Sequence, residues 1–187
     1  MKPPLPRYLF RVVAVILWSI ALAVALIGPD DPSDGRIRQT IRVALACYFL
    51  AVAQLLLSIR DARLVWTLGW AAYLVHVALA FHLAFGWSHA EAVEQTRQRS
   101  GVGEGIYVSH LFTLLWTVDV GWWWLSPRGH TSRPRWMTWA LHGFMAFMVF
   151  NATVVYETGP IRWAGVAGFL TLAVLVARRI RAHRPIR

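Results

Sequence analysis

Charged residues are scarce in this sequence. They make up 15% of its 187 residues, whereas soluble globular domains carry about 25%. Acidic residues are the scarcest, since 9 Asp and Glu stand against 19 Lys and Arg. No stretch is long and polar enough to form a separate soluble domain. We therefore predict one transmembrane helical domain over residues 1–187.

Cysteine is nearly absent as well. The single cysteine, Cys47, lies inside an apolar stretch and has no partner for an intramolecular disulfide. We interpret it as a small packed residue. Motifs of hydrolases and of activated nucleophiles are also missing, so the sequence assigns no reaction and leaves open whether the protein is an enzyme.

The net charge of +10 does not indicate a nucleic-acid partner. The basic residues lie at the ends of apolar segments, which is typical of charges that set the orientation of a membrane protein. A basic face interleaved with aromatic residues is absent. The basic tail from Arg178 to Arg184 is expected to lie against anionic lipid headgroups. The lipid bilayer is therefore the predicted partner, and nucleic acid is excluded.

Long apolar runs recur along the chain, in which 57% of the residues are hydrophobic. A helix that spans a bilayer needs about 20 mostly apolar residues. Six segments meet this requirement: 8–27, 41–59, 64–86, 106–125, 136–156 and 161–177. The runs do not alternate as the strands of a membrane β-barrel do. We predict an all-α polytopic membrane protein with six transmembrane helices.

The lysine and arginine residues predict the orientation of these helices. If both termini are cytoplasmic, most of these residues lie in cytoplasmic segments: Lys2, Arg7, Arg11, Arg60, Arg63, Arg128, Arg133, Arg135, Arg178, Arg179, Arg181, Arg184 and Arg187. The outer segments would hold Arg36, Arg38, Arg42, Arg97, Arg99 and Arg162. This bias follows the positive-inside rule. We predict an N-in/C-in protein of a bacterial inner (plasma) membrane.

The first apolar segment also has an alternative interpretation. Lys2, Arg7 and Arg11 precede it, and Ala21-Leu22-Ala23 resembles a cleavage site, so the segment is open to interpretation as a cleaved signal peptide. The apolar run is long for such a peptide. The other five helices would keep their orientation.

Histidines near the outer ends of the predicted helices form the first candidate site. His82 lies four residues before the end of segment 64–86, and His110 lies four residues into segment 106–125, so each is about 6 Å below the outer surface. Asn151 has a similar depth, and His89 follows His82 by seven residues. Imidazole suits zinc, copper and iron, and two histidines on facing helices bind a haem from both sides. His82, His110 and His89 are therefore candidate ligands of haem b or of a transition metal.

A second polar layer is expected closer to the cytoplasm. Asp119 lies six residues before Leu125, and His142 lies six residues after Trp136. The short loop between these two segments predicts antiparallel neighbours, so an Asp119–His142 hydrogen bond or ion pair is expected. His76 lies near the middle of the membrane. Ionisable groups at such depths are costly and usually functional.

Three functional hypotheses remain open at this stage. The first is a haem or metal site at the outer histidines. The second is proton-coupled transport through the titratable groups. The third is a structural role as a subunit of a larger membrane complex, in which the histidines only form interhelical hydrogen bonds. The sequence names no substrate and no cofactor.

Overall fold

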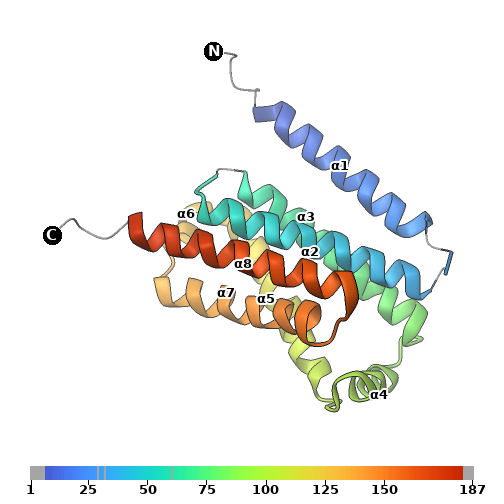
Figure 1. Cartoon of the computed structure of the whole chain (residues 1–187). Coiled ribbons are helices and arrows are strands. Elements are labelled where there is room, and N and C mark those ends of the chain that lie inside the picture. The colour runs from blue at the N-terminus through green and yellow to red at the C-terminus, as the bar shows by residue number, and fades with distance from the viewer. Residues whose placement is uncertain (1–6, 29, 32, 60, 183–187) are drawn as a thin grey trace. The chain divides into compact units, whose positions relative to one another are not determined.

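In the computed structural model, residues 7–28, 30, 31, 33–59 and 61–182 are described, and these residues form helices without any strand (Figure 1). The prediction of an all-helical fold is confirmed. The chain divides into two compact units, residues 1–87 and residues 88–187. The organisation as a single domain stays a prediction.

The first unit contains three long helices and a π-helical turn. They are α1 (Arg7–Ile27), α2 (Asp34–Leu56), α3 (Ala62–Leu79) and η1 (Ala80–Ala84), which continues α3 directly. The connection before α2 is held by Asp31, whose Oδ1 accepts hydrogen bonds from the Ser33 backbone N–H at 3.0 Å, the Ser33 hydroxyl at 2.9 Å and the Asp34 N–H at 3.2 Å. The bonds from Ser33 stabilise the ionised carboxylate, so they hold the pKa of Asp31 below its usual value.

Helices α2 and α3 pack closely and form the core of this unit. Small residues line the contact and let the two backbones approach: Ala44, Ala51, Ala62, Gly69 and Ala72 are all buried. Between them the ring of Tyr48, 1% exposed, lies 5.9 Å from the ring of Trp66, which is fully buried. A hydrogen bond between His76 Nδ1 and the Ile37 carbonyl oxygen, at 2.9 Å, joins α3 to the first turns of α2.

Helix α1 lies beside α2 and α3 but contacts them sparsely (Figure 1). Most of its side chains are exposed, as expected for a helix with lipid on most sides. Two polar contacts attach it to α3. The Trp18 indole N–H donates to the Leu68 carbonyl at 3.0 Å, and Arg11 Nε donates to Asp61 Oδ1 at 2.9 Å.

The second unit begins with a polar helix that was not predicted as a separate element. Helix α4 (His89–Ser100) starts at Ser88, whose hydroxyl accepts from the Glu91 N–H at 3.2 Å, and ends at Gly101, which adopts a left-handed φ of 80°. The sequence left open whether the start of this segment extends the preceding helix. It does not, because Gly86 and Trp87 both take positive φ values and end η1. The Ser88 cap then begins a new helix.

Three further long helices, a short helix and a π-helical turn follow. The elements are α5 (Gly105–Leu125), α6 (Pro127–Thr131), α7 (Arg135–Phe150), the π-helical turn η2 (Asn151–Val155) and α8 (Gly159–Ala182). Helices α5 and α7 pack together, and the ring of Phe112 on α5 lies 6.5 Å from the ring of Phe144 on α7. Helix α8 packs on η2 at Gly165, where an added Cβ would lie 2.7 Å from the Thr153 hydroxyl. Glycine is therefore required at this contact.

Five helices among the described residues are long and apolar enough to cross a membrane. They cover Tyr8–Ile27, Asp34–Leu56, Ala62–Ala84, Arg135–Val155 and Gly159–Ala182. Helix α5 has a similar length, but it carries Asp119, His110 and a run of tryptophans and is not among the five. The protein is thus a helical membrane protein with several apolar helices. The observed helices match the predicted segments, except that α2 begins before residue 41 and α8 continues beyond residue 177.

Candidate functional site

Asp119 is the most deeply buried acidic residue in the described part of the second unit. It lies on α5 about 9 Å from the end of the helix at Leu125, and only 3% of the residue is exposed. Its Oδ1 accepts hydrogen bonds from Arg133 Nη1 and from His130 Nε2, the latter at 3.1 Å. A buried carboxylate therefore has two cationic or potentially cationic partners.

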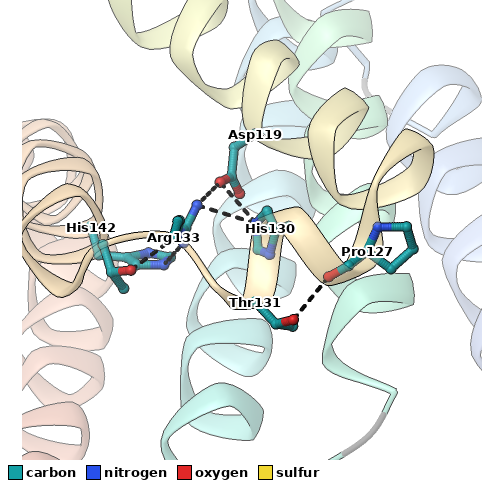
Figure 2. A network of polar contacts seen from close by, with 7 residues as sticks. Asp119, Pro127, His130, Thr131, Arg133 and His142 are labelled. Atoms are coloured by element: carbon teal, nitrogen blue, oxygen red, sulfur yellow. Dashed lines mark hydrogen bonds and ion pairs between the residues drawn. The ribbon is translucent and has the colours of Figure 1, made fainter.

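Arg133 links the elements around this carboxylate. It lies in the connection between α6 and α7, and Figure 2 shows its side chain between Asp119 and His142. Its Nε donates to the Thr138 hydroxyl at 2.9 Å, and its Nη2 lies 3.5 Å from His142 Nε2. A planar guanidinium with several fixed donors suits this role, because it can bond to α5 and α7 at the same time.

His130 is placed by the short helix α6. Pro127 begins this helix, and its fixed φ suits the first helical position. One turn later, the His130 ring stacks on the Trp123 ring at 4.5 Å with an angle of 5° between the planes, and it meets the Trp122 ring edge-on at 5.9 Å. His130 is 6% exposed. The tryptophan run of α5 thus fixes the orientation of this imidazole.

The hydrogen-bond roles of both histidines follow from their partners. A carboxylate only accepts, so His130 Nε2 must carry the proton that it donates to Asp119. His130 Nε2 and Arg133 Nη1 lie 3.2 Å apart because both donate to the same oxygen, Asp119 Oδ1. The contact between these two nitrogens is therefore not itself a hydrogen bond. A guanidinium only donates, so His142 Nε2 accepts from Arg133 and its Nδ1 carries the proton in the neutral ring. We call these four side chains, Asp119, His130, Arg133 and His142, the Asp119 cluster.

A narrow cleft adjoins the Asp119 cluster. Its volume is 260 Å³, and it is lined by Leu115, Val118, Asp119, Trp122, Arg133, Trp136, Met137, Ala140 and Leu141. All but Asp119 and Arg133 present apolar or aromatic surface. Its lining, apolar with two converging polar groups, is typical of a small-molecule site, and its volume lies just below the usual range of about 300–1,000 Å³.

The sequence predicted part of this arrangement. Asp119 and His142 were expected to pair directly across α5 and α7, and both do belong to one cluster. Arg133, however, stands between them (Figure 2). Sequence reasoning missed Arg133 and His130 as site residues, because a loop arginine was interpreted only as an orientation signal. The signal that could have identified Arg133 is that a carboxylate within an apolar helix, such as Asp119, needs a cationic partner, and the following loop contains arginines.

The predicted outer histidines are only partly brought together. His89, at the start of α4, and His110, on α5, have ring centroids 5.5 Å apart with 27° between the ring planes. The Tyr107 ring lies 5.4 Å from the His89 ring. His82 belongs to the first unit, so its relation to this pair stays a prediction.

His82 and Asn151 both lie in π-helical turns, η1 and η2. His82 Nδ1 accepts a hydrogen bond of 3.3 Å from the Trp87 indole N–H, so Nε2 carries the proton in the neutral ring. Asn151 Nδ2 donates to the Phe147 carbonyl at 2.8 Å. To bind a metal through Nδ1, His82 would have to break its hydrogen bond with Trp87. To bind through Nε2, it would have to lose the proton from that nitrogen or move it to Nδ1.

Within the described residues, no three side chains of His, Cys, Asp or Glu are grouped closely enough to bind a metal ion. His76 is hydrogen-bonded between α3 and α2, which is the structural role considered for the buried histidines. No known protein family matches the chain, and neither a curated protein nor a solved structure matches it.

Proposed function

We propose that this protein couples proton movement to transport across a membrane, with Asp119 as the group that takes up the proton. The observation that carries this proposal is the contact of Asp119 with Arg133 and His130, beside an apolar cleft. Ionisable residues inside a membrane protein usually mark substrate or proton pathways. Imidazole and carboxylate groups are the side chains that proton relays in membranes use, and both occur in the Asp119 cluster.

The chemistry of the cluster suits a two-state switch. In the observed state the Asp119 carboxylate balances the Arg133 guanidinium. A proton added to the carboxylate removes that negative charge, and Arg133 then lacks its ion-pair partner. Because an unpaired buried charge is strongly unfavourable, the cluster must rearrange or open toward the cleft. Protonation would thereby alter access to the cleft between α5 and α7.

Replacing Asp119 by asparagine tests the proposal. We expect purified protein in liposomes to show proton uptake in response to an imposed pH gradient, measured with an enclosed pH-sensitive dye. The Asp119→Asn variant should lose this uptake, because an amide cannot bind the proton at that position. Helical content, measured by far-UV circular dichroism, should stay unchanged.

Asp61→Asn is the matched control. Asp61 is also a carboxylate bonded to an arginine, Arg11 at 2.9 Å, but it lies outside the Asp119 cluster. Uptake should persist in this variant. Equal uptake in wild type and Asp119→Asn would contradict the proposal. A wild type without uptake, whose Asp119→Asn variant is only less stable, would favour the third hypothesis of a structural subunit in a larger membrane complex.

A second candidate function is the binding of haem or a transition-metal ion by His89 and His110. The observation that favours it is the proximity of the two rings, which lie 5.5 Å apart on separate helices. Imidazole nitrogen is a suitable ligand for both iron and zinc. His82 could contribute only after breaking its bond from Trp87, so we place it behind this pair.

The second function predicts a bound cofactor that depends on these two residues. Purified protein should show either a haem absorption band or a stoichiometric metal by elemental analysis. His89→Ala and His110→Ala should each lose it, whereas His76→Ala, which alters a histidine bonded to the Ile37 carbonyl, should keep it. A colourless, metal-free preparation would remove this candidate.

Both functions are proposed for a six-span arrangement with α5 as the sixth span, both termini cytoplasmic, in a bacterial inner membrane. The distribution of arginine and lysine supports this orientation. Lys2, Arg60, Arg184 and Arg187, which contribute to it, lie outside the described residues. Reporter tags near residues 32 and 95 should be exported and a tag near residue 130 should stay cytosolic. The reverse pattern would overturn the orientation.

A further inference from the structure

The first unit contains an apolar groove between α1 and the α2–α3 pair. Its volume is 770 Å³, and it is lined by Phe10, Val13, Ala14, Leu17, Trp18, Ala21, Val24, Ala25, Gly28, Gln39, Arg42, Val43, Ala46, Cys47, Leu50, Gln54, Val65 and Leu68. The lining residues come from α1, α2 and α3, and Figure 1 shows α1 running beside α2. The volume falls within the range of about 300–1,000 Å³ that is typical of small-molecule sites.

Gln54 is an unusual member of this lining. It is 6% exposed, and its side-chain oxygen has no hydrogen-bond partner among the described residues. Buried amide oxygens are almost always bonded. An amide offers one acceptor and two donors, and a hydroxyl group matches it by donating to Oε1 and accepting at Nε2. The groove therefore provides a place for a hydroxyl.

Among the described residues, none that lines the groove at its Gln54 end is charged. The lining residues there are apolar, as in Phe10, Val13 and Val65. Arg11, which follows Phe10 in the chain, is already bonded to Asp61. An uncharged head is therefore favoured at this end over a phosphate or a carboxylate.

The length of the groove suits an extended acyl chain. Gln39, at the opposite end of the lining, precedes Gln54 by fifteen residues of α2, which is about 23 Å along the axis. This length is about three quarters of a hydrocarbon core of about 30 Å. A lipid whose chain runs along α1 and α2 therefore fills most of the groove.

We propose that this groove binds an uncharged lipid with a hydroxyl head, whose hydroxyl is hydrogen-bonded to the Gln54 amide and whose chain lies along α1 and α2 toward Arg42. The observations that carry it are the unpartnered Gln54 oxygen, the apolar lining and the length of the groove. It does not depend on the function proposed for the Asp119 cluster, because every lining residue belongs to the first unit.

Cys47 provides a direct readout of occupancy. It lines the groove and is the only cysteine in the sequence, so a maleimide reports on this position alone. The probe is monoolein, and methyl oleate is the matched lipid without a hydroxyl. In detergent micelles, monoolein at about ten times its dissociation constant should slow labelling of Cys47 roughly tenfold. Methyl oleate at the same concentration should have a much smaller effect.

Two variants locate the head. Gln54→Leu should lose most of the protection by monoolein and respond to monoolein and methyl oleate alike. Gln39→Leu, at the other end of the groove, should keep the wild-type response. Leucine removes the buried, unpartnered oxygen of Gln54, so the variant is expected to fold, and unchanged labelling without lipid would confirm this.

Three results would overturn the proposal. Equal protection by monoolein and methyl oleate in the wild type would show that no hydroxyl is recognised. Unchanged protection in Gln54→Leu would show that Gln54 does not hold it. Stronger protection by oleate, lost in Arg42→Gln, would establish a charged lipid with its head at the opposite end.

Discussion

Replacing Arg133 by methionine is expected to destabilise the second unit by about 3–5 kcal/mol, the usual cost of removing one partner from a buried ion pair. Asp119 is 3% exposed, and the Arg133 side chain is 7% exposed. Without the guanidinium, the carboxylate loses its ion-pair partner but keeps the bond from His130, and Thr138 loses its donor. The free energy of unfolding, measured in detergent by tryptophan fluorescence, should show this loss.

A double-mutant cycle separates the ion pair from other effects of the change. Arg133→Met combined with Asp119→Asn removes both charges, so the double variant should be more stable than the sum of the two single losses predicts. The coupling free energy should lie at about 1–3 kcal/mol. Arg97→Met is the control, because the Arg97–Glu94 pair is about half exposed and such pairs contribute about 0–1 kcal/mol. Additive losses would show that Arg133 and Asp119 act independently.

The double variant also separates stability from function. If Asp119 takes up the transported proton, Arg133→Met with Asp119→Asn should recover stability but not proton uptake. If the Asp119 cluster only joins α5, α6 and α7, any proton uptake by the wild type should return in the double variant together with its stability. The same pair of substitutions therefore distinguishes the transport proposal from a structural role.

The helices could be predicted from the sequence because their signal is local. An apolar run of about 20 residues identifies a spanning helix without knowledge of its neighbours. The ends were harder to predict. Helix α2 begins at Asp34, so Arg36 and Arg38 lie in its first turns, although both were assigned to a loop. Charged residues are tolerated in the end turns of a membrane helix, because long side chains reach toward the interface.

The site was predicted less completely because it depends on how the chain returns on itself. Depth counting placed Asp119 and His142 at one level, and this much is consistent with the observed cluster. It cannot show that Arg133 folds back from the α6–α7 connection to lie between them. The π-helical turns at His82 and Asn151 were also missed. A π turn inserts one residue, so it shifts the helix face that simple counting assigns.

The second large loss of stability is expected when Trp66 is replaced. Replacing this residue by alanine should destabilise the first unit by about 3–5 kcal/mol. Trp66 is fully buried, and its ring lies 5.9 Å from the ring of Tyr48 across the α2–α3 contact. In a bilayer the lipid tails are as apolar as the core, so helices associate mainly through close packing. The cavity left by Trp66→Ala would remove packing contacts between α2 and α3.

Trp163→Ala supplies the comparison, because Trp163 is 70% exposed and its removal opens no cavity. Stability is measured for both by titration with a denaturing detergent, followed by far-UV circular dichroism. Trp66→Phe should lose less than Trp66→Ala, since phenylalanine fills part of the space. Should the two alanine variants lose equal stability, burial of Trp66 would not be what stabilises the first unit. The association of α2 with α3 would then have to depend on their small residues and on the His76 hydrogen bond to Ile37.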